Sequence, residues 1–204
     1  MRVLVLETER HAADAAVRSL EASGHHVARC HEPDLSAFPC AALCDDGMCP
    51  IEEGEGVDVA LTVRNHAYPR PTAFEDGVGC ALRQGVPLVV AGVTAMNPFD
   101  KWTTSISADD DIVQACEDAA TAPVEALIRP ARAELHRRLR RVDASTAGAD
   151  VDVRRRGRTL RATVMLPNAA PEMESEVAVT VAGVLRDRAR YVSGIDVAVK
   201  RSNG

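Results

Sequence analysis

The sequence predicts an α/β protein in which a doubly wound parallel sheet is followed by a small αββαβ domain. Over about residues 1–120, short apolar runs alternate with amphipathic helical segments, which is typical of parallel strands covered by helices on both faces. From about residue 145, the order changes to two adjacent strands, a helix and a last strand. The hydrophobic fraction of 46% supports a packed core.

The first strand is the apolar run of residues 3–6, and an unbroken run indicates a strand that is covered on both faces. Residues 11–23 then form a helix, because Leu20 and several alanines recur at helical spacing and Gly24 ends the pattern. The other elements of this half follow from the same periodicities: strands at 26–30, 57–63, 87–91 and 102–106, and helices at 74–84 and 109–119. Residues 31–56 form a long loop, and loops of this length in compact domains are usually functional or disordered.

Residues 121–144 are predicted to be an Arg-rich amphipathic connector between the two domains. Its apolar residues form a seam close to heptad spacing: Val124, Ile128, Ala131, Leu135, Leu139 and Val142. Pro130 predicts a break or a helix start within it. Because neither domain is expected to cover this seam, the sequence predicts a homo-oligomer, formed through this helix or through the small domain.

The small ββαβ domain is expected over residues 145–204. Strands at 151–155 and 160–166 are joined by a tight turn at Arg156 and Gly157. In the second of these strands apolar residues alternate with polar ones, so one face is expected to be buried. A helix begins at Pro171, and residues 195–199 form the last strand.

The order of elements in residues 1–120 resembles that of a response-regulator receiver or another flavodoxin-like domain. Glu7 and Glu9 follow the first strand, where receivers carry an acidic cluster. Arg64 stands near the receiver's phosphoacceptor position, and Gly92 stands where a Thr or Ser is expected. Phosphotransfer is therefore not expected. The first strand is also not followed by the G-x-G-x-x-G pattern of dinucleotide sites.

The C-terminal part is similar to the small domain of the alkaline-shock (envelope-stress) family and to BON-type domains. The features that carry this resemblance are the hairpin with Gly157, the Val-rich helix, and the closing GIDVAVK of residues 194–200. The resemblance implies a binding or assembly role in a stress response rather than catalysis.

The net charge of −6 is unevenly distributed. Residues 1–128 carry 8 Lys and Arg against 21 Asp and Glu, whereas residues 129–161 carry 11 Arg against 4 acidic residues. The basic stretch predicts an anionic partner, which is an acidic protein, a nucleic acid or a lipid surface. With no apparent signal peptide and no apolar run long enough to span a membrane, the sequence predicts a soluble, cytoplasmic protein without a transmembrane segment.

Four cysteines are the candidate site of chemistry: Cys40, Cys44, Cys49 and Cys80. Their spacing does not match the short C-x2-C pairs of common zinc modules, but it is compatible with an iron–sulfur cluster or a zinc site. Three interpretations stay open: a metal centre, a redox disulfide, or chemically inert thiols. Cys30 and Cys116 are interpreted as structural, one at the end of a strand and one inside a helix.

Five arginines surround the predicted hairpin turn: Arg154, Arg155, Arg156, Arg158 and Arg161. One interpretation is a site for phosphate or anionic lipid. The other interpretation is that these arginines pair with residues of the acidic half of the chain, in the same or another subunit, or remain solvated at the edge of the sheet.

Two classes of function follow. The first is a non-enzymatic regulatory or assembly protein with a cysteine metal or redox site and a basic binding hairpin. The second is a redox or metal-dependent enzyme that uses the cysteine loop at the C-terminal edge of the sheet. We favour the first, because the sequence shows no nucleophile–base pair and no phosphate-binding loop.

Overall fold

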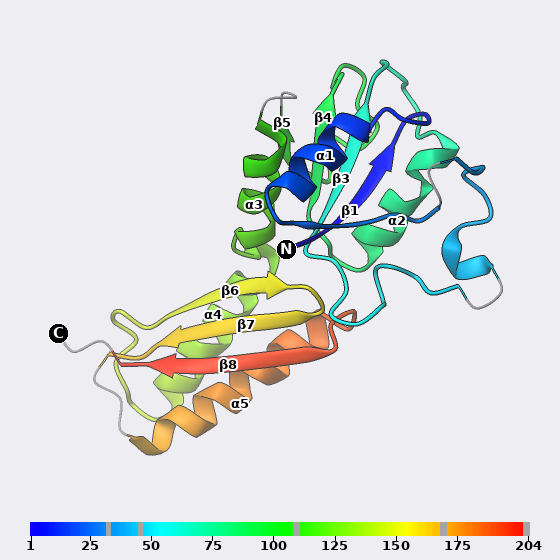
Figure 1. Cartoon of the computed structure of the whole chain (residues 1–204). Helices are drawn as coiled ribbons and strands as arrows, with labels where there is room; N and C mark the ends of the chain where they lie inside the picture. The colour runs from blue at the N-terminus through cyan, green and yellow to red at the C-terminus, as the bar shows by residue number, and fades with distance from the viewer. Residues whose placement is uncertain (32–33, 45–46, 108–110, 168–170, 202–204) are drawn as a thin grey trace. The chain divides into compact units, whose positions relative to one another are not determined.

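The chain forms two compact units, Met1–Thr121 and Ala122–Gly204. The computed structural model (Figure 1) describes residues 1–31, 34–44, 47–107, 111–167 and 171–201.

The first unit is built on a five-stranded, entirely parallel sheet in the order β2-β1-β3-β4-β5. The α/β class and the parallel sheet predicted from the sequence are thereby confirmed. The elements are β1 (Arg2–Glu7), α1 (Asp14–Ala22), β2 (His26–Ala28), η1 (Ala41–Leu43), β3 (Val59–Arg64), η2 (Ala73–Glu75), α2 (Asp76–Arg83), β4 (Leu88–Gly92), β5 (Thr103–Ser107) and α3 (Ile112–Thr121). The predicted start of the last helix, at residue 109, lies outside the described residues.

Helices cover both faces of this sheet, which explains the unbroken apolar run of residues 3–6 in β1. Val3 and Val5 of β1 share a core with α1 and α3, whereas Leu4 and Leu6 point to the face covered by α2. The alternation of side chains along a strand therefore supplies two separate cores from one apolar run.

The connection from β2 to β3 is irregular, although it makes a crossover that usually contains an α-helix. Among its described residues, only the single turn η1 is helical. Ile51 and Val57 of this segment are almost fully buried and belong to the core on the α2 face. An irregular segment rich in Cys, Pro and Gly thus lies on the same face of the sheet as α2.

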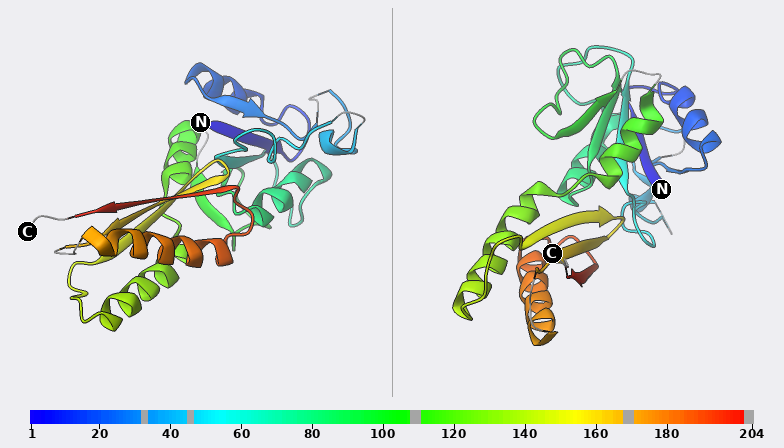
Figure 2. Two further views of the ribbon diagram at one scale, coloured as in Figure 1. Left: turned by 90° about the horizontal axis from the view of Figure 1, so that it is seen from below. Right: turned by 90° about the vertical axis from the view of Figure 1, so that its left-hand side faces the viewer.

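The second unit is a three-stranded sheet with two helices. Its elements are α4 (Glu125–Arg141), β6 (Asp150–Arg156), β7 (Thr159–Met165), α5 (Pro171–Arg188) and β8 (Gly194–Lys200). The sheet order is β6-β7-β8, with β6 antiparallel and β8 parallel to β7. Figure 2 shows both helices on the same side of this sheet. The side chains of Leu160, Ala162, Val164 and Leu166 are buried, as the alternation of β7 and the residue after it predicts.

The structure corrects the predicted role of residues 121–144. α4 belongs to the second unit, where Leu127, Ile128, Ala131, Leu135 and Leu139 are buried in its core. The prediction of an uncovered seam on this helix was therefore wrong, because the adjoining sheet covers it.

Pro130 does not break the helix either. α4 is continuous from Glu125 to Arg141 with Pro130 inside it. Pro130 is the sixth residue of α4, where a proline removes one backbone hydrogen bond and crowds the preceding turn. Burial of the neighbouring Ile128 and Ala131 favours the helix in spite of this cost.

Candidate functional site

Four cysteine side chains line one cavity of about 170 Å³ on the α2 face of the first unit: Cys30, Cys40, Cys49 and Cys80. They come from three separate stretches of chain. Cys30 follows β2, Cys40 and Cys49 belong to the irregular crossover, and Cys80 lies on α2. The cavity lies against the apolar core of this face, because Cys30, Cys49 and Cys80 pack on that core.

Backbone hydrogen bonds hold the crossover next to the end of β2. The amide of Ala41 donates to the carbonyl of Cys30 at 2.6 Å. The carbonyl of Cys49 accepts from the amides of Glu52 and Glu53, both at 2.9 Å, in a turn that follows Pro50. The first contact holds Cys40 next to Cys30, and the second closes a local turn at Cys49.

Gly77 makes room for the Cys30 thiol. A Cβ atom at position 77 would lie 2.8 Å from Cys30 Sγ and 2.7 Å from Leu6 Cδ2, closer than such atoms approach each other. A side chain at this position of α2 would therefore displace either the thiol or a core leucine. Sequence reasoning did not single out Cys30 or this function of Gly77.

The pKa of the Cys30 thiol reflects its burial and the other thiols around the cavity. Burial raises the pKa of the Cys30 thiol to about 12, with further contributions from Cys49, Cys80 and Cys40. Near neutral pH this thiol is protonated in the protein without a bound metal.

The thiol of Cys80 contacts the guanidinium group of Arg83. Nη2 of Arg83, one turn later on α2, lies 3.1 Å from Cys80 Sγ. The Cys80 sulfur therefore has a hydrogen-bond donor from its own helix. His31 and Phe74 also line the cavity, with their rings edge to face at a centroid distance of 5.2 Å.

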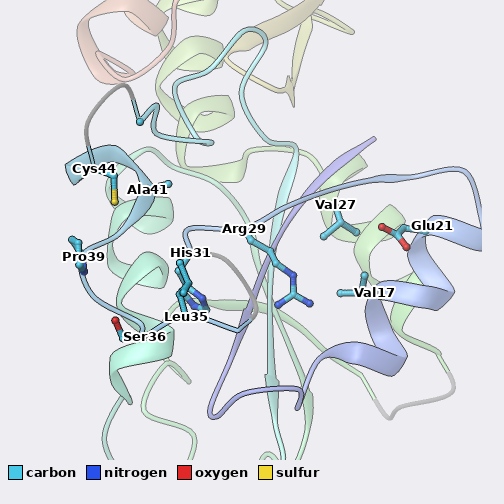
Figure 3. A pocket seen from close by; sticks show the side chains of 11 residues that line it. Val17, Glu21, Val27, Arg29, His31, Leu35, Ser36, Pro39, Ala41 and Cys44 are labelled. Carbon is cyan, nitrogen blue, oxygen red and sulfur yellow. The ribbon is translucent and has the colours of Figure 1, made fainter.

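Cys44 lies outside this cavity, contrary to the grouping expected from the sequence. It directly follows η1, its side chain is exposed, and its sulfur lies 3.7 Å from the carbonyl oxygen of Cys40. It lines a separate groove between the crossover and α1, together with Arg29 and Leu35 (Figure 3). The structure thus brings together three of the four predicted cysteines and adds Cys30, which the sequence had suggested was structural.

The four thiols line the cavity, but they are not close enough together to coordinate a metal ion. Within the described ranges of the chain, no three His, Cys, Asp or Glu side chains are grouped closely enough to hold a metal ion. All six cysteines are free thiols. Closure around an ion would require Cys40 and Cys49 to move with their segment towards Cys30 and Cys80.

At the C-terminal edge of the sheet, where such folds usually bind ligands, Glu7 and Arg64 are held in structural pairs. Glu7 is buried and accepts hydrogen bonds from the amide of Ala13 at 3.0 Å and from Arg29 at 3.4 Å. Arg64 is fully buried and pairs with Glu75 at 3.2 Å. The position that resembles a phosphoacceptor therefore holds a buried cation.

The five arginines of the hairpin are not equivalent. Arg155 points into the core side, is 7% exposed, and donates from Nε to the carbonyl of Gly157 at 2.5 Å. Its guanidinium also lies over the ring of Tyr191, at 6.0 Å. Strand alternation thus removes Arg155 from the predicted anion-binding surface. Arg154, Arg156 and Arg161 are exposed and Arg158 is half-buried.

Arg154 and Arg161 lie directly opposite each other on the two antiparallel strands. Like charges in this arrangement disfavour the sheet. Asp152 relieves part of the repulsion through an ion pair with Arg154 at 2.8 Å.

None of the helices within the described residues has the length and apolar character needed to cross a membrane. No protein-family model matches the sequence, and no curated protein matches it significantly.

Proposed function

We propose that this chain is a non-enzymatic regulatory or assembly protein whose first unit binds a thiophilic metal through Cys30, Cys40, Cys49 and Cys80. The observation that carries the proposal is the placement of these four thiols, from three stretches of chain, around one cavity. Four thiolates are the ligand set of structural zinc sites and also of iron–sulfur clusters.

Metal binding would order the crossover segment that carries Cys40 and Cys49. Cys30 and Cys80 are attached to the sheet edge and to α2, whereas Cys40 and Cys49 lie in irregular chain. Zinc–sulfur bonds are about 2.3 Å long, so an ion would draw Cys40 and Cys49, with their irregular segment, towards Cys30 and Cys80. The free energy of binding then becomes free energy of ordering this segment.

The same segment carries apolar side chains that are exposed to solvent: Leu35, Phe38, Leu43 and Met48 are each 60% exposed or more. Exposed apolar side chains concentrated in one segment are typical of a surface that meets a partner. A metal that orders the segment would therefore change the surface offered to that partner, which is the regulatory role that we propose.

The test compares metal retention in matched cysteine variants. The wild-type protein, loaded with zinc and desalted, is expected to retain the ion against a chromophoric chelator. Cys30→Ser is expected to lower the affinity by about 100-fold or more, because loss of a direct ligand costs more than loss of an outer-shell partner. Cys44→Ser is the matched control from the same segment and is expected to bind like the wild type.

Two results would overturn the assignment. If Cys44→Ser lost the metal while Cys30→Ser kept it, the ligand set would be wrong. If the wild-type protein retained neither zinc nor, when purified without oxygen, a visible iron–sulfur absorption, the metal function would be wrong.

The contact between Arg83 and Cys80 favours one other candidate, a redox enzyme or sensor. Reactive cysteines usually lie beside a basic side chain, and Arg83 Nη2 lies 3.1 Å from Cys80 Sγ. In that case oxidised glutathione, as the oxidant, would convert two thiols of the chain into a disulfide and be reduced to two glutathione thiols. Thiol titration before and after this treatment separates the two functions.

The exposed arginines of the second unit are the other element of the proposal. Arg156 and Arg161 would contact an anionic partner, and the like-charged pair formed by Arg154 and Arg161 supports this, because an anion would relieve its repulsion. Replacing both Arg156 and Arg161 with Gln should weaken binding to a polyanion such as heparin and reduce its salt dependence. Unchanged retention on heparin would remove this element.

A further inference from the structure

β8 is an edge strand whose outer side has no partner among the described strands. It pairs with β7 alone, in parallel. The amide of Leu166 donates to the carbonyl of Lys200, so the backbone groups of Lys200 point towards β7. Because these directions alternate along a strand, the groups of Val197 and Val199 point to the free edge. An unpaired row of this kind is a template for another strand.

The sequence of β8 is complementary to itself in the antiparallel direction. If two copies of the strand pair about Ala198, Val197 of one copy lies opposite Val199 of the other. The free backbone groups of these two residues then form the hydrogen-bonded pairs of an antiparallel ladder. In the same register Asp196 lies opposite Lys200, twice in the symmetric pair. Cross-strand pairs of opposite charge stabilise a sheet.

Other registers that use the same backbone groups fit less well. Pairing about Asp196 places two carboxylates opposite each other, and pairing about Lys200 places two ammonium groups opposite each other. Asp196, Ala198 and Lys200 are exposed, whereas Val197 and Val199 are half-buried against the helices. The charged pairs would thus lie on the open face and the apolar pairs on the covered face.

The position of α5 also favours a second copy of the chain as the partner of β8. α4 contacts β6, whereas α5 contacts β8 and lies along it (Figure 1). Glu176 marks the side of α5 that faces α4, because it pairs with Arg138 of that helix. About half a turn around α5, on the side beyond the free strand edge, lie the half-buried Ala178 and Ala182. Small side chains there allow the same helix of a second copy to approach closely.

We propose that the second unit forms a homodimer through antiparallel pairing of β8 about Ala198. The product is a continuous six-stranded sheet in which two copies of α5 meet on the covered face. This inference goes beyond the metal-binding function and does not depend on it.

The test uses the full chain in sedimentation velocity over a range of concentrations. The wild-type protein is expected to dimerise at about 10⁻⁵ M or below. Asp196→Lys and Lys200→Asp, made separately, each turn both attractive pairs into repulsive ones and should weaken association roughly 10-fold or more. An equimolar mixture of the two variants should recover the dimer, because each charge then again meets its opposite.

A backbone variant tests the pairing itself. Val199→Pro removes an amide that points to the free edge and leaves the hydrogen bonds to β7 intact, so the unit should fold but no longer dimerise. Circular dichroism melting checks the fold of each variant. The proposal is overturned if the wild type is monomeric at about 10⁻⁴ M. It is also overturned if folded Val199→Pro dimerises normally, or if the mixture of charge variants associates no better than either variant alone.

Discussion

Gly77 and Gly79 lie on the same helix, α2, but an added methyl group at each would meet very different surroundings. At position 77 the new Cβ would lie 2.7 Å from Leu6 Cδ2 and 2.8 Å from Cys30 Sγ. At position 79 the nearest atom is the flexible end of Arg83, at 3.9 Å. Both backbones are helical, so alanine should gain the same helix propensity, about 1 kcal/mol, at either site.

The difference between Gly77→Ala and Gly79→Ala therefore isolates the cost of crowding the thiol and the core. Overpacking costs about 1–3 kcal/mol, so Gly77→Ala should be less stable than Gly79→Ala by that amount. Gly79→Ala itself should be about 1 kcal/mol more stable than the wild type. Urea unfolding followed by the fluorescence of Trp102, the only tryptophan, reports on the first unit.

A third variant identifies the atom that is crowded. Adding Cys30→Ala to Gly77→Ala removes one of the two close contacts, so the two substitutions should couple by about 0.5 kcal/mol or more. Equal stability of Gly77→Ala and Gly79→Ala would refute the placement of Cys30 against α2, and with it the geometry of the cavity.

Two further predictions concern buried charge in the first unit. Glu75→Ala leaves the buried Arg64 without its ion-pair partner and should cost about 3–5 kcal/mol in urea unfolding, whereas Arg64→Met combined with Glu75→Leu should cost much less. A loss below about 1 kcal/mol for the single variant would contradict this. Burial, and then the charge of Glu117, raises the pKa of the Cys116 thiol to about 12. Because the unfolded thiol ionises at lower pH, its contribution to stability should be complete below about pH 9 and should fall as the pH rises towards 12. Cys116→Ala should remove up to about 1.4 kcal/mol per pH unit from this decline, and an unchanged slope above pH 9 would contradict the assignment.

The parallel sheet was predictable because its signal is local. The run from Val3 to Leu6 has no polar position, which is typical of a strand covered on both faces. The alternation from Leu160 to Leu166 likewise predicted one buried face, and these side chains are buried.

The environment of α4 was not predictable in the same way. Its apolar seam is visible in the sequence, but the surface that covers Leu135 and Leu139 comes from strands that follow later in the chain. A periodic seam shows that a helix face is buried, and it does not show whether the same chain or another copy buries it.

The cysteine cavity was predictable only in part, for a related reason. Cys40, Cys49 and Cys80 were grouped by their positions around one crossover and one helix. The prediction included Cys44, which lies outside the cavity, and left out Cys30, which lines it. The direction of side chains in an irregular segment depends on turns such as η1, and these turns have no periodic signal in the sequence. The missing side chain of Gly77, which makes space for Cys30, is informative only once the helix is seen against β1.

The central claim, a four-thiolate metal site, is tested most directly by X-ray absorption at the zinc edge of the zinc-loaded protein. The account predicts four sulfur neighbours at about 2.3 Å in the wild type and in Cys44→Ser. It predicts a sulfur shell reduced by one in Cys30→Ser. A shell of nitrogen and oxygen atoms in the wild type, or a sulfur shell that changes with Cys44 and not with Cys30, would contradict it.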